Sequence, residues 1–246
     1  MSRAWLTRFL FIAALGFFLF GLHRLVHLRF ESGRAYAPLS SLRTDPLGAK
    51  ALHDALAAVE GLEVERNYVP LRQRQALPAD STVLLLGLPG HSLFPLPELR
   101  VLRQFVESGG RLVLALDASK VAYEHLDDEG EPLVRDAAEE EEAGPEGFTR
   151  RSGGDEWEIW KGLSLRHGEH EGGQARRAET ASDQLPREVP WREGGVLVEF
   201  DDSVWRSVYL LEDEVVGARR SYGSGSIVVM TDSYLFSNEA MLRHRQ

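Results

Sequence analysis

The strongest constraint on the fold is a strand–helix–strand pattern in the first half of the sequence. An apolar run at residues 82–88 is followed by an amphipathic segment at 96–108, the pair Gly109-Gly110 and a second apolar run at 111–117. Continuous apolar runs are typical of parallel strands that are covered on both faces. The amphipathic segment fits a helix that ends at Gly109. The pattern therefore predicts a βαβ unit with a right-handed crossover.

Further elements are expected on both sides of this unit. Thr44-Asp45-Pro46 is typical of a helix start, with a capping residue before proline at the first helical position, and predicts a helix to about residue 59. A short strand is expected at 62–66. Later segments rich in strand-forming residues are 195–200, 204–211, 214–220 and 226–232. The alternation of strands and helices predicts the α/β class, with a mostly parallel sheet flanked by helices.

The first thirty residues contain an apolar segment. Residues 9–22 hold no polar side chain, but such a helix rises only about 21 Å against a hydrocarbon core of about 30 Å. Trp5 suits a membrane interface, and Arg8 and Arg24 can extend their charged ends toward the headgroups. Counted with these flanks, residues 5–26 predict an uncleaved transmembrane helix in contact with membrane lipid. We expect a single-pass protein of the cell membrane, with the main domain outside the cytoplasm.

Charge and composition exclude several functions. Lysine and arginine number 28 against 38 aspartates and glutamates, a net charge of −10, and such a chain is poorly suited to bind nucleic acid. Residues 118–195 account for the imbalance and predict a β-rich acidic insertion with short aromatic strands such as 155–162. Within it, the acidic run 136–147 is typical of a solvated loop, and 126–147 is a candidate docking segment for a partner. Cysteine is absent, which excludes disulfides, thiolate metal ligands and cysteine nucleophiles.

These signals predict three parts. An N-terminal membrane anchor occupies residues 1–28, and a lead-in linker follows at 29–43. The α/β domain occupies 44–246 and carries the insertion at about 118–195.

Polar residues follow several of the predicted strands. Open α/β sheets bind ligands beyond the carboxyl ends of their strands, and the N–H groups at the helix start near Asp45 favour an anion. The ligand-binding candidates are Arg43, Thr44, His91, Ser92, Asp117, Ser119, Asp232 and Ser233. Each of them, taken singly, also fits a residue that caps a turn or a helix. Together they predict one polar crevice.

A catalytic or metal site is the alternative. Ser92 or Ser119 with His91 and Asp117 supply the residue types of a hydrolytic triad, but no G-x-S-x-G pentapeptide occurs. Residues 167–171, His-Gly-Glu-His-Glu, offer donors for zinc without the H-E-x-x-H spacing, and a solvated loop is the favoured interpretation. We therefore predict no catalytic residue, no metal and no cofactor.

Three segments carry a resemblance to a known family. They are LRTDPLGAKALHDALAAV, FVESGGRLVLALD and YGSGSIVVMTDSYLFSN. With the apolar N-terminal segment, they resemble the bacterial membrane proteins grouped as domain of unknown function 4350. The resemblance implies a membrane-tethered, flavodoxin-like domain, similar to class I glutamine amidotransferase-like domains and without an established activity. Genes of this family often neighbour those of MoxR-type ATPases, which implies a protein complex.

The chain departs from this family pattern in two ways. Amidotransferases of the related fold use a cysteine nucleophile, so the absence of cysteine excludes that chemistry here. The family pattern usually continues past Asn238 into a further helix, so a helix that covers the last strand is expected to be missing.

The expected function is therefore binding. We expect a membrane-anchored, non-catalytic α/β domain that binds a ligand or a protein partner as part of a membrane-associated complex. The alternative is a membrane-tethered hydrolase with a Ser/His/Asp or metal site at the strand-end crevice. A third hypothesis is a structural subunit that holds an assembly together.

Overall fold

The computed structural model describes most of the chain. The described residues are 3–31, 36–74, 77–89, 96–117, 155–166, 172–192, 195–198 and 200–243. They form two compact units, which are described separately. Unit 1 comprises Met1–Val64 and Ser237–Gln246, and unit 2 comprises Glu65–Phe236.

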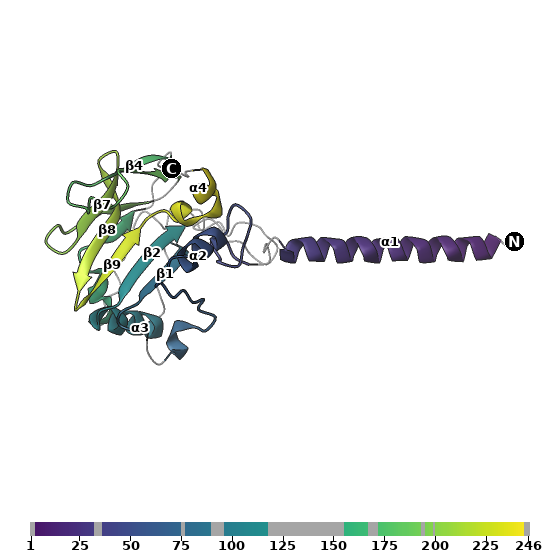
Figure 1. Cartoon of the computed structure of the whole chain (residues 1–246), viewed down its shortest axis with the longest axis horizontal. Coiled ribbons are helices and arrows are strands. Elements are labelled where there is room, and N and C mark those ends of the chain that lie inside the picture. The colour runs from purple at the N-terminus through teal and green to yellow at the C-terminus, as the bar shows by residue number, and fades with distance from the viewer. Residues whose placement is uncertain are drawn as a thin grey trace, which may run out of the picture. The chain divides into compact units, whose positions relative to one another are not determined.

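Unit 1 is helical. Its elements are α1 (Arg3–Glu31), α2 (Lys50–Ala57) and α4 (Asn238–Arg243) (Figure 1). Helix α2 packs against α4. This packing brings together segments from the N-terminal and C-terminal parts of the sequence. The helix predicted to begin at Pro46 begins four residues later, because the N–H of Gly48 donates to the carbonyl of Asp45 and closes a turn there.

The N-terminal prediction needs correction. No helix in the part of the chain that the structure describes is long and apolar enough to cross a membrane. This finding overturns the predicted transmembrane helix, its lipid contact at residues 5–26 and the single-pass location in the cell membrane. The error lies in extending the apolar run 9–22 over polar flanks, since the run alone rises only about 21 Å.

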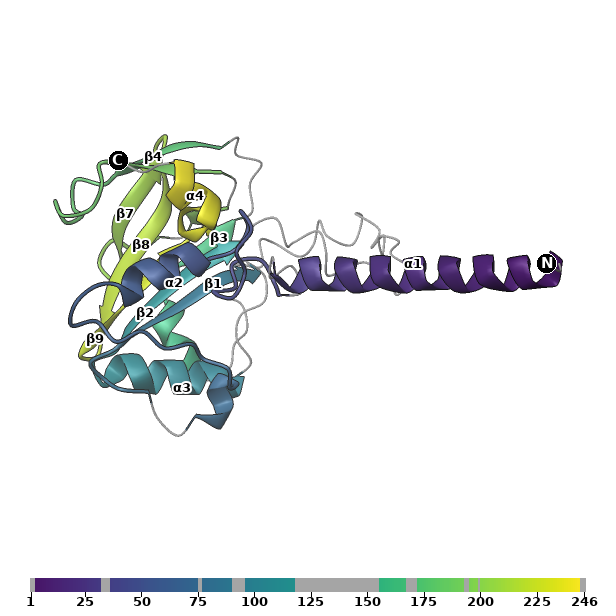
Figure 2. The same cartoon turned by 45° about the vertical axis from the view of Figure 1, so that its right-hand side comes forward.

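Unit 2 is built on a seven-stranded sheet (Figures 1 and 2). Across the sheet its strands are β1 (Thr82–Pro89), β2 (Arg111–Asp117), β9 (Gly225–Met230), β8 (Glu214–Tyr222), β7 (Arg206–Leu211), β4 (Gly173–Arg177) and β5 (Glu188–Trp191). A second sheet pairs β3 (Ser164–Arg166) with β6 (Val196–Val198). The described helical elements are α3 (Leu96–Glu107), η1 (Leu71–Gln73), η3 (Asp155–Trp160) and η4 (Tyr234–Phe236). Strands therefore dominate this unit.

The prediction of a flavodoxin-like, mostly parallel sheet with flanking helices is wrong. Among the described strands, only β1, β2 and β9 run parallel to one another, and every pairing from β9 to β5 is antiparallel. The result is a curled, mixed half-barrel (Figure 1). The cause lies in the connections, since β7 to β8 and β8 to β9 are each joined by two residues. So short a link joins only antiparallel strands.

The predicted βαβ unit is confirmed in its elements and strand direction. The β1–β2 register runs in parallel from Thr82 opposite Arg111 to Pro89 opposite Asp117. The buried face of α3 consists of Leu99, Leu102, Phe105 and Val106, and Gly109, with φ of 118°, ends the helix. Two other predicted strands are wrong, because 62–66 has no strand and 155–160 is a 3-10 helix.

Two apolar clusters lie on the opposite faces of the sheet. Alternate residues of β9 separate them, with Val229 in the cluster that contains α3 and Met230 in the cluster that contains Trp191. Because side chains alternate along a strand, Asp232 continues the face of Met230. The sheet thus directs Asp232 toward the β5 side of unit 2.

Candidate functional site

Two carboxylates lie at the carboxyl ends of neighbouring parallel strands. Asp117 is the last residue of β2, and Asp232 follows the end of β9. Ala115 of β2 pairs with Met230 of β9, so Asp117 and Asp232 occupy equivalent positions two residues further along. Their charges interact, since Asp117 raises the pKa of Asp232. The structure therefore brings together these two residues of the predicted crevice.

Asp232 is buried and hydrogen-bonded at both oxygens. Asp232 is only 6% exposed to solvent. Oδ2 accepts from the backbone N–H of Arg192 at 2.7 Å, and Oδ1 accepts from the backbone N–H of Tyr234 at 2.8 Å. The carboxylate thus ties the residue after β5 to the start of η4.

The effects that raise the pKa of Asp232 outweigh those that lower it. Burial raises the pKa of Asp232 to about 6, and Asp117 adds to this effect, while the hydrogen bonds from Arg192 and Tyr234 oppose it. The Arg192 guanidinium lies 4.4 Å from the centre of the Tyr234 ring, and its charge lowers the pKa of Asp232 less than the two backbone hydrogen bonds do. At neutral pH Asp232 is therefore mostly an ionised carboxylate beside a second acidic residue.

Sequence reasoning missed Arg192 and Tyr234. Tyr234 had a local signal, because an aspartate that accepts from the N–H two residues later forms a common turn. Arg192 had none, since it reaches the site through a contact that spans 40 residues. Ser233, which was predicted, is buried, and its carbonyl accepts from the N–H of Phe236 at 3.0 Å. Its described role is to shape η4.

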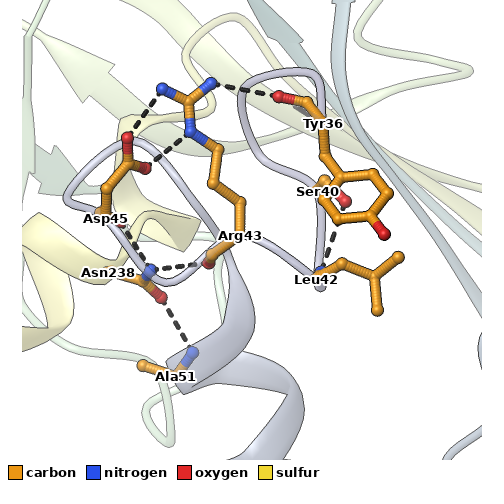
Figure 3. Close-up of polar contacts among 7 residues, drawn as sticks. All are labelled: Tyr36, Ser40, Leu42, Arg43, Asp45, Ala51 and Asn238. Carbon is orange, nitrogen blue, oxygen red and sulfur yellow. Dashed lines mark hydrogen bonds and ion pairs between the residues drawn. The ribbon is translucent and has the colours of Figure 1, made fainter. Parts of the chain in front are cut away.

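Arg43 is engaged within its own loop in unit 1 (Figure 3). Its Nε and Nη2 donate to the two carboxylate oxygens of Asp45 at 2.6 and 2.7 Å, and its Nη1 donates to the carbonyl of Tyr36 at 3.2 Å. The bond to Asp45 raises the pKa of Arg43. Thr44 lies between these partners in sequence. The guanidinium therefore fixes the loop that precedes α2.

Asn238 joins this loop to α2 and α4 (Figure 3). Its Nδ2 donates to the carbonyls of Arg43 at 3.0 Å and Asp45 at 2.7 Å. Its Oδ1 accepts from the N–H of Ala51 at 2.8 Å, and its own N–H donates to the carbonyl of Gly48 at 2.7 Å. An N–H in the first turn of α2 is thus satisfied by a side chain from the other end of the sequence.

The remaining candidates cannot be placed. His91, Ser92 and Ser119 lie outside the described residues, as do the segments 126–147 and 167–171. Arg43 and Thr44 belong to unit 1, whereas Asp117, Asp232 and Ser233 belong to unit 2. The single crevice that combines all eight therefore stays a prediction. Among the described residues, no three His, Asp or Glu side chains gather in a way that can hold a metal ion.

The sequence is related to a known protein family. It matches the family described as "Domain of unknown function (DUF4350)" over residues 41–246. The chain belongs to this family. The family assignment from the three sequence segments is thereby confirmed. No curated protein matches the sequence.

Several solved structures show distant similarity. The "mmIFT52 N-terminal domain" has a TM-score of 0.46 and 12% identity, with 79% of this chain and 83% of that chain covered. The "Cytoplasmic Protein STM1381 from Salmonella typhimurium LT2" has a TM-score of 0.43 and 13% identity, with 76% of each chain covered. A beta-galactosidase from Bacillus circulans sp. alkalophilus has a TM-score of 0.36 and 10% identity, with 66% of this chain and 22% of that chain covered. Scores at this level support no inference about function.

Proposed function

We propose that the chain is a non-catalytic binding protein that takes up a cationic group of a ligand or protein partner at the carboxylate pair Asp117–Asp232. The observation that carries this proposal is the buried Asp232, which has a second acidic residue as its neighbour at the carboxyl ends of parallel strands. Ligands of open sheets gather at such ends.

Asp117 and Asp232 carry like charges that repel each other. A buried carboxylate loses hydration and needs hydrogen bonds or an opposite charge in exchange. Asp232 receives two backbone hydrogen bonds, but burial and Asp117 still raise its pKa to about 6. An ammonium or guanidinium group placed between the two carboxylates removes their repulsion. Binding of a cation therefore lowers the pKa of Asp232.

The hydrogen bonds of Asp232 support binding rather than catalysis. A carboxylate that orients a catalytic base usually accepts from the side chain of that base, most often histidine. In the described part of the chain, the donors to Asp232 are the backbone N–H groups of Arg192 and Tyr234. A carboxylate held in this way is fixed in position, which suits recognition of a cation.

The overall charge supports the same class of partner. The net charge of −10 attracts cationic proteins and repels anionic ones. The MoxR-type ATPase implied by the family resemblance is the first protein partner to test. A basic segment of such a partner is the expected ligand for the carboxylate pair.

The test is a titration of the full chain with tetralysine, followed by calorimetry at low salt. Asp117→Asn and Asp232→Asn are each expected to weaken binding at least fivefold. Asp202→Asn is the matched control, because Asp202 is exposed and lies outside the site, and it is expected to leave the affinity unchanged. Equal affinities for all three variants would show that tetralysine binds only through net charge, and would refute the proposal.

Proton release gives a second readout at pH 6. If the cation lowers the pKa of Asp232, binding must release protons near the free value of about 6. Calorimetry in two buffers of different ionisation enthalpy measures this release. If tetralysine binds to the natural chain without releasing protons, a cation does not lie at Asp232.

A further inference from the structure

Strand β1 forms one edge of the seven-stranded sheet. In the described part of the chain, its only neighbouring strand is β2. The eight residues of β1, TVLLLGLP, include no charged side chain. Thr82 is exposed and Leu84 is 38% exposed in the folded chain. Two side chains in the first half of β1 are therefore exposed, while its open edge has no further described strand beside it.

Natural proteins usually protect such an edge. Charged side chains, bulges and proline are the common means, because an open strand offers unpaired N–H and C=O groups to any extended segment. In β1 the register shift between Leu86 and Leu88, and Pro89, lie at the carboxyl end. Residues 82–86 carry neither a charge nor a register shift. This part of the edge is suited to accept another strand.

We propose that an extended segment of a partner protein adds to the open edge of β1 as a further strand, with a lysine or arginine at the end that lies beside Asp117. This inference rests on the proposed function and adds that the partner binds as an extended strand. Main-chain hydrogen bonds to β1 supply affinity, and an apolar residue packs beside Leu84.

The charges along the edge select this occupant. At the amino end of β1, Thr82 pairs with Arg111, and Asp80 lies two residues before it, so opposite charges balance. At the carboxyl end Pro89 pairs with Asp117, beyond which lies Asp232. With two carboxylates against the one guanidinium of Arg192, this end keeps an acidic excess, and a segment that ends in a cation complements it. A second copy of this chain brings its own net charge of −10 and is disfavoured.

The test uses a fluorescent peptide, Thr-Val-Thr-Val-Thr-Lys-Lys, and anisotropy with the full chain. The matched probe is the same peptide N-methylated at alternate residues, which keeps its charge and side chains but loses the donors needed for strand pairing. We expect the natural peptide to bind at least tenfold more tightly than the methylated one. Equal affinities would overturn the edge proposal.

A neutral substitution tests the position on the protein. Leu84→Gln is expected to weaken binding of the peptide about three- to fivefold, since a cross-strand contact contributes up to about 1 kcal/mol. Leu185→Gln is the matched control, because Leu185 is 37% exposed outside the sheet, and no change is expected. An equal effect of both substitutions would overturn the proposal.

The remaining outcomes separate this inference from the proposed function. If tetralysine binds at Asp117 and Asp232 but the peptide gains nothing from its N–H groups, the proposed function stands and the edge proposal fails. If neither ligand binds, both fail. If sedimentation shows dimers of the free chain that Leu84→Gln abolishes, the edge belongs to a second copy and the proposal is again overturned.

Discussion

The side-chain amide of Asn238 donates to the backbone oxygen of Asp45 at 2.7 Å, across 193 residues of sequence. This contact links two of the three segments that carry the family resemblance, LRTDPLGAKALHDALAAV and the SYLFSN end of the third. Asn238 also donates to Arg43 and accepts from Ala51. Three backbone groups of unit 1 therefore depend on one side chain.

Replacing Asn238 is expected to destabilise the chain. Asn238→Ala removes the partners of two carbonyls and one N–H, and each lost bond costs about 1 kcal/mol, so the free energy of unfolding should fall by about 2–4 kcal/mol. Asn238→Asp keeps the size but turns a donor into an acceptor against two carbonyls, and should be at least as damaging. Urea unfolding measures both variants.

The control for this prediction is Asn67→Ala. Asn67 is exposed, and its side chain bonds only to the nearby Val69 and Arg74. Its loss should cost less than about 1 kcal/mol. If Asn238→Ala costs no more than this control, the long-range contact contributes nothing specific.

Gly48 is expected to tolerate no side chain. A Cβ at this position would lie 1.9 Å from the carbonyl oxygen of Arg43, so Gly48→Ala must displace backbone and should cost about 2–4 kcal/mol. Thermal unfolding is the measurement. Gly16→Ala in α1 is the control, because nothing beyond the adjoining residues and backbone of its own helix lies within 4 Å of the added carbon. Equal melting temperatures for both variants would contradict the crowding at Gly48.

Local signals in the sequence were sufficient for the βαβ unit. The apolar runs at 82–88 and 111–117 and the stop at Gly109 each depend on neighbouring residues, and all appear as expected. The predicted direction of the strands beyond β9 is wrong because the strand–helix alternation of the first half does not continue there. The two-residue links at Glu212-Asp213 and Gly223-Ser224 already required antiparallel hairpins.

In the candidate site, the sequence predicts only those contacts that follow from the direction of neighbouring strands. Parallel strands place their carboxyl ends together, and this rule correctly brought Asp117 to Asp232. The contacts of Asp232 with Arg192, and of Asn238 with Arg43, span 40 and 195 residues. Such contacts depend on packing between distant elements, and no local pattern in one sequence specifies them.

Arg220 is expected to hold η3 on the sheet. Its Nη1 donates to the carbonyls of Glu158 at 3.1 Å and Ile159 at 2.9 Å, and its guanidinium faces the rings of Trp205 and Tyr222 at 5.4 and 5.0 Å. Burial lowers the pKa of Arg220. Arg220→Met keeps the apolar stem but removes these bonds, and should cost about 2–4 kcal/mol.

Limited proteolysis checks this role directly. Release of η3 should make trypsin cleave after Lys161 several-fold faster in Arg220→Met than in the natural chain. Arg219→Met is the neighbouring control, since Arg219 is exposed and its loss should change stability by less than about 0.5 kcal/mol. Equal cleavage rates in the two variants would refute the assigned role of Arg220.

Asp232 should give stability an unusual pH dependence. Its pKa is raised from an ordinary 3.8 to about 6 in the folded chain, first by burial and then by Asp117. The folded state therefore binds the proton more tightly than the unfolded state. The stability from this group is complete below about pH 4 and is lost as pH rises through about 6.

The measurement is the free energy of unfolding of the natural chain minus that of Asp232→Asn, from urea curves between pH 4 and pH 8. This difference should fall with rising pH by about 2–3 kcal/mol, at about 1.4 kcal/mol per unit of pKa, and become constant above pH 7. Asp202→Asn, at an exposed position, should show no such slope. A difference that instead grows with pH would mean that the ionised carboxylate of Asp232 is stabilised by the fold. The electrostatic basis of the proposed cation site would then be lost.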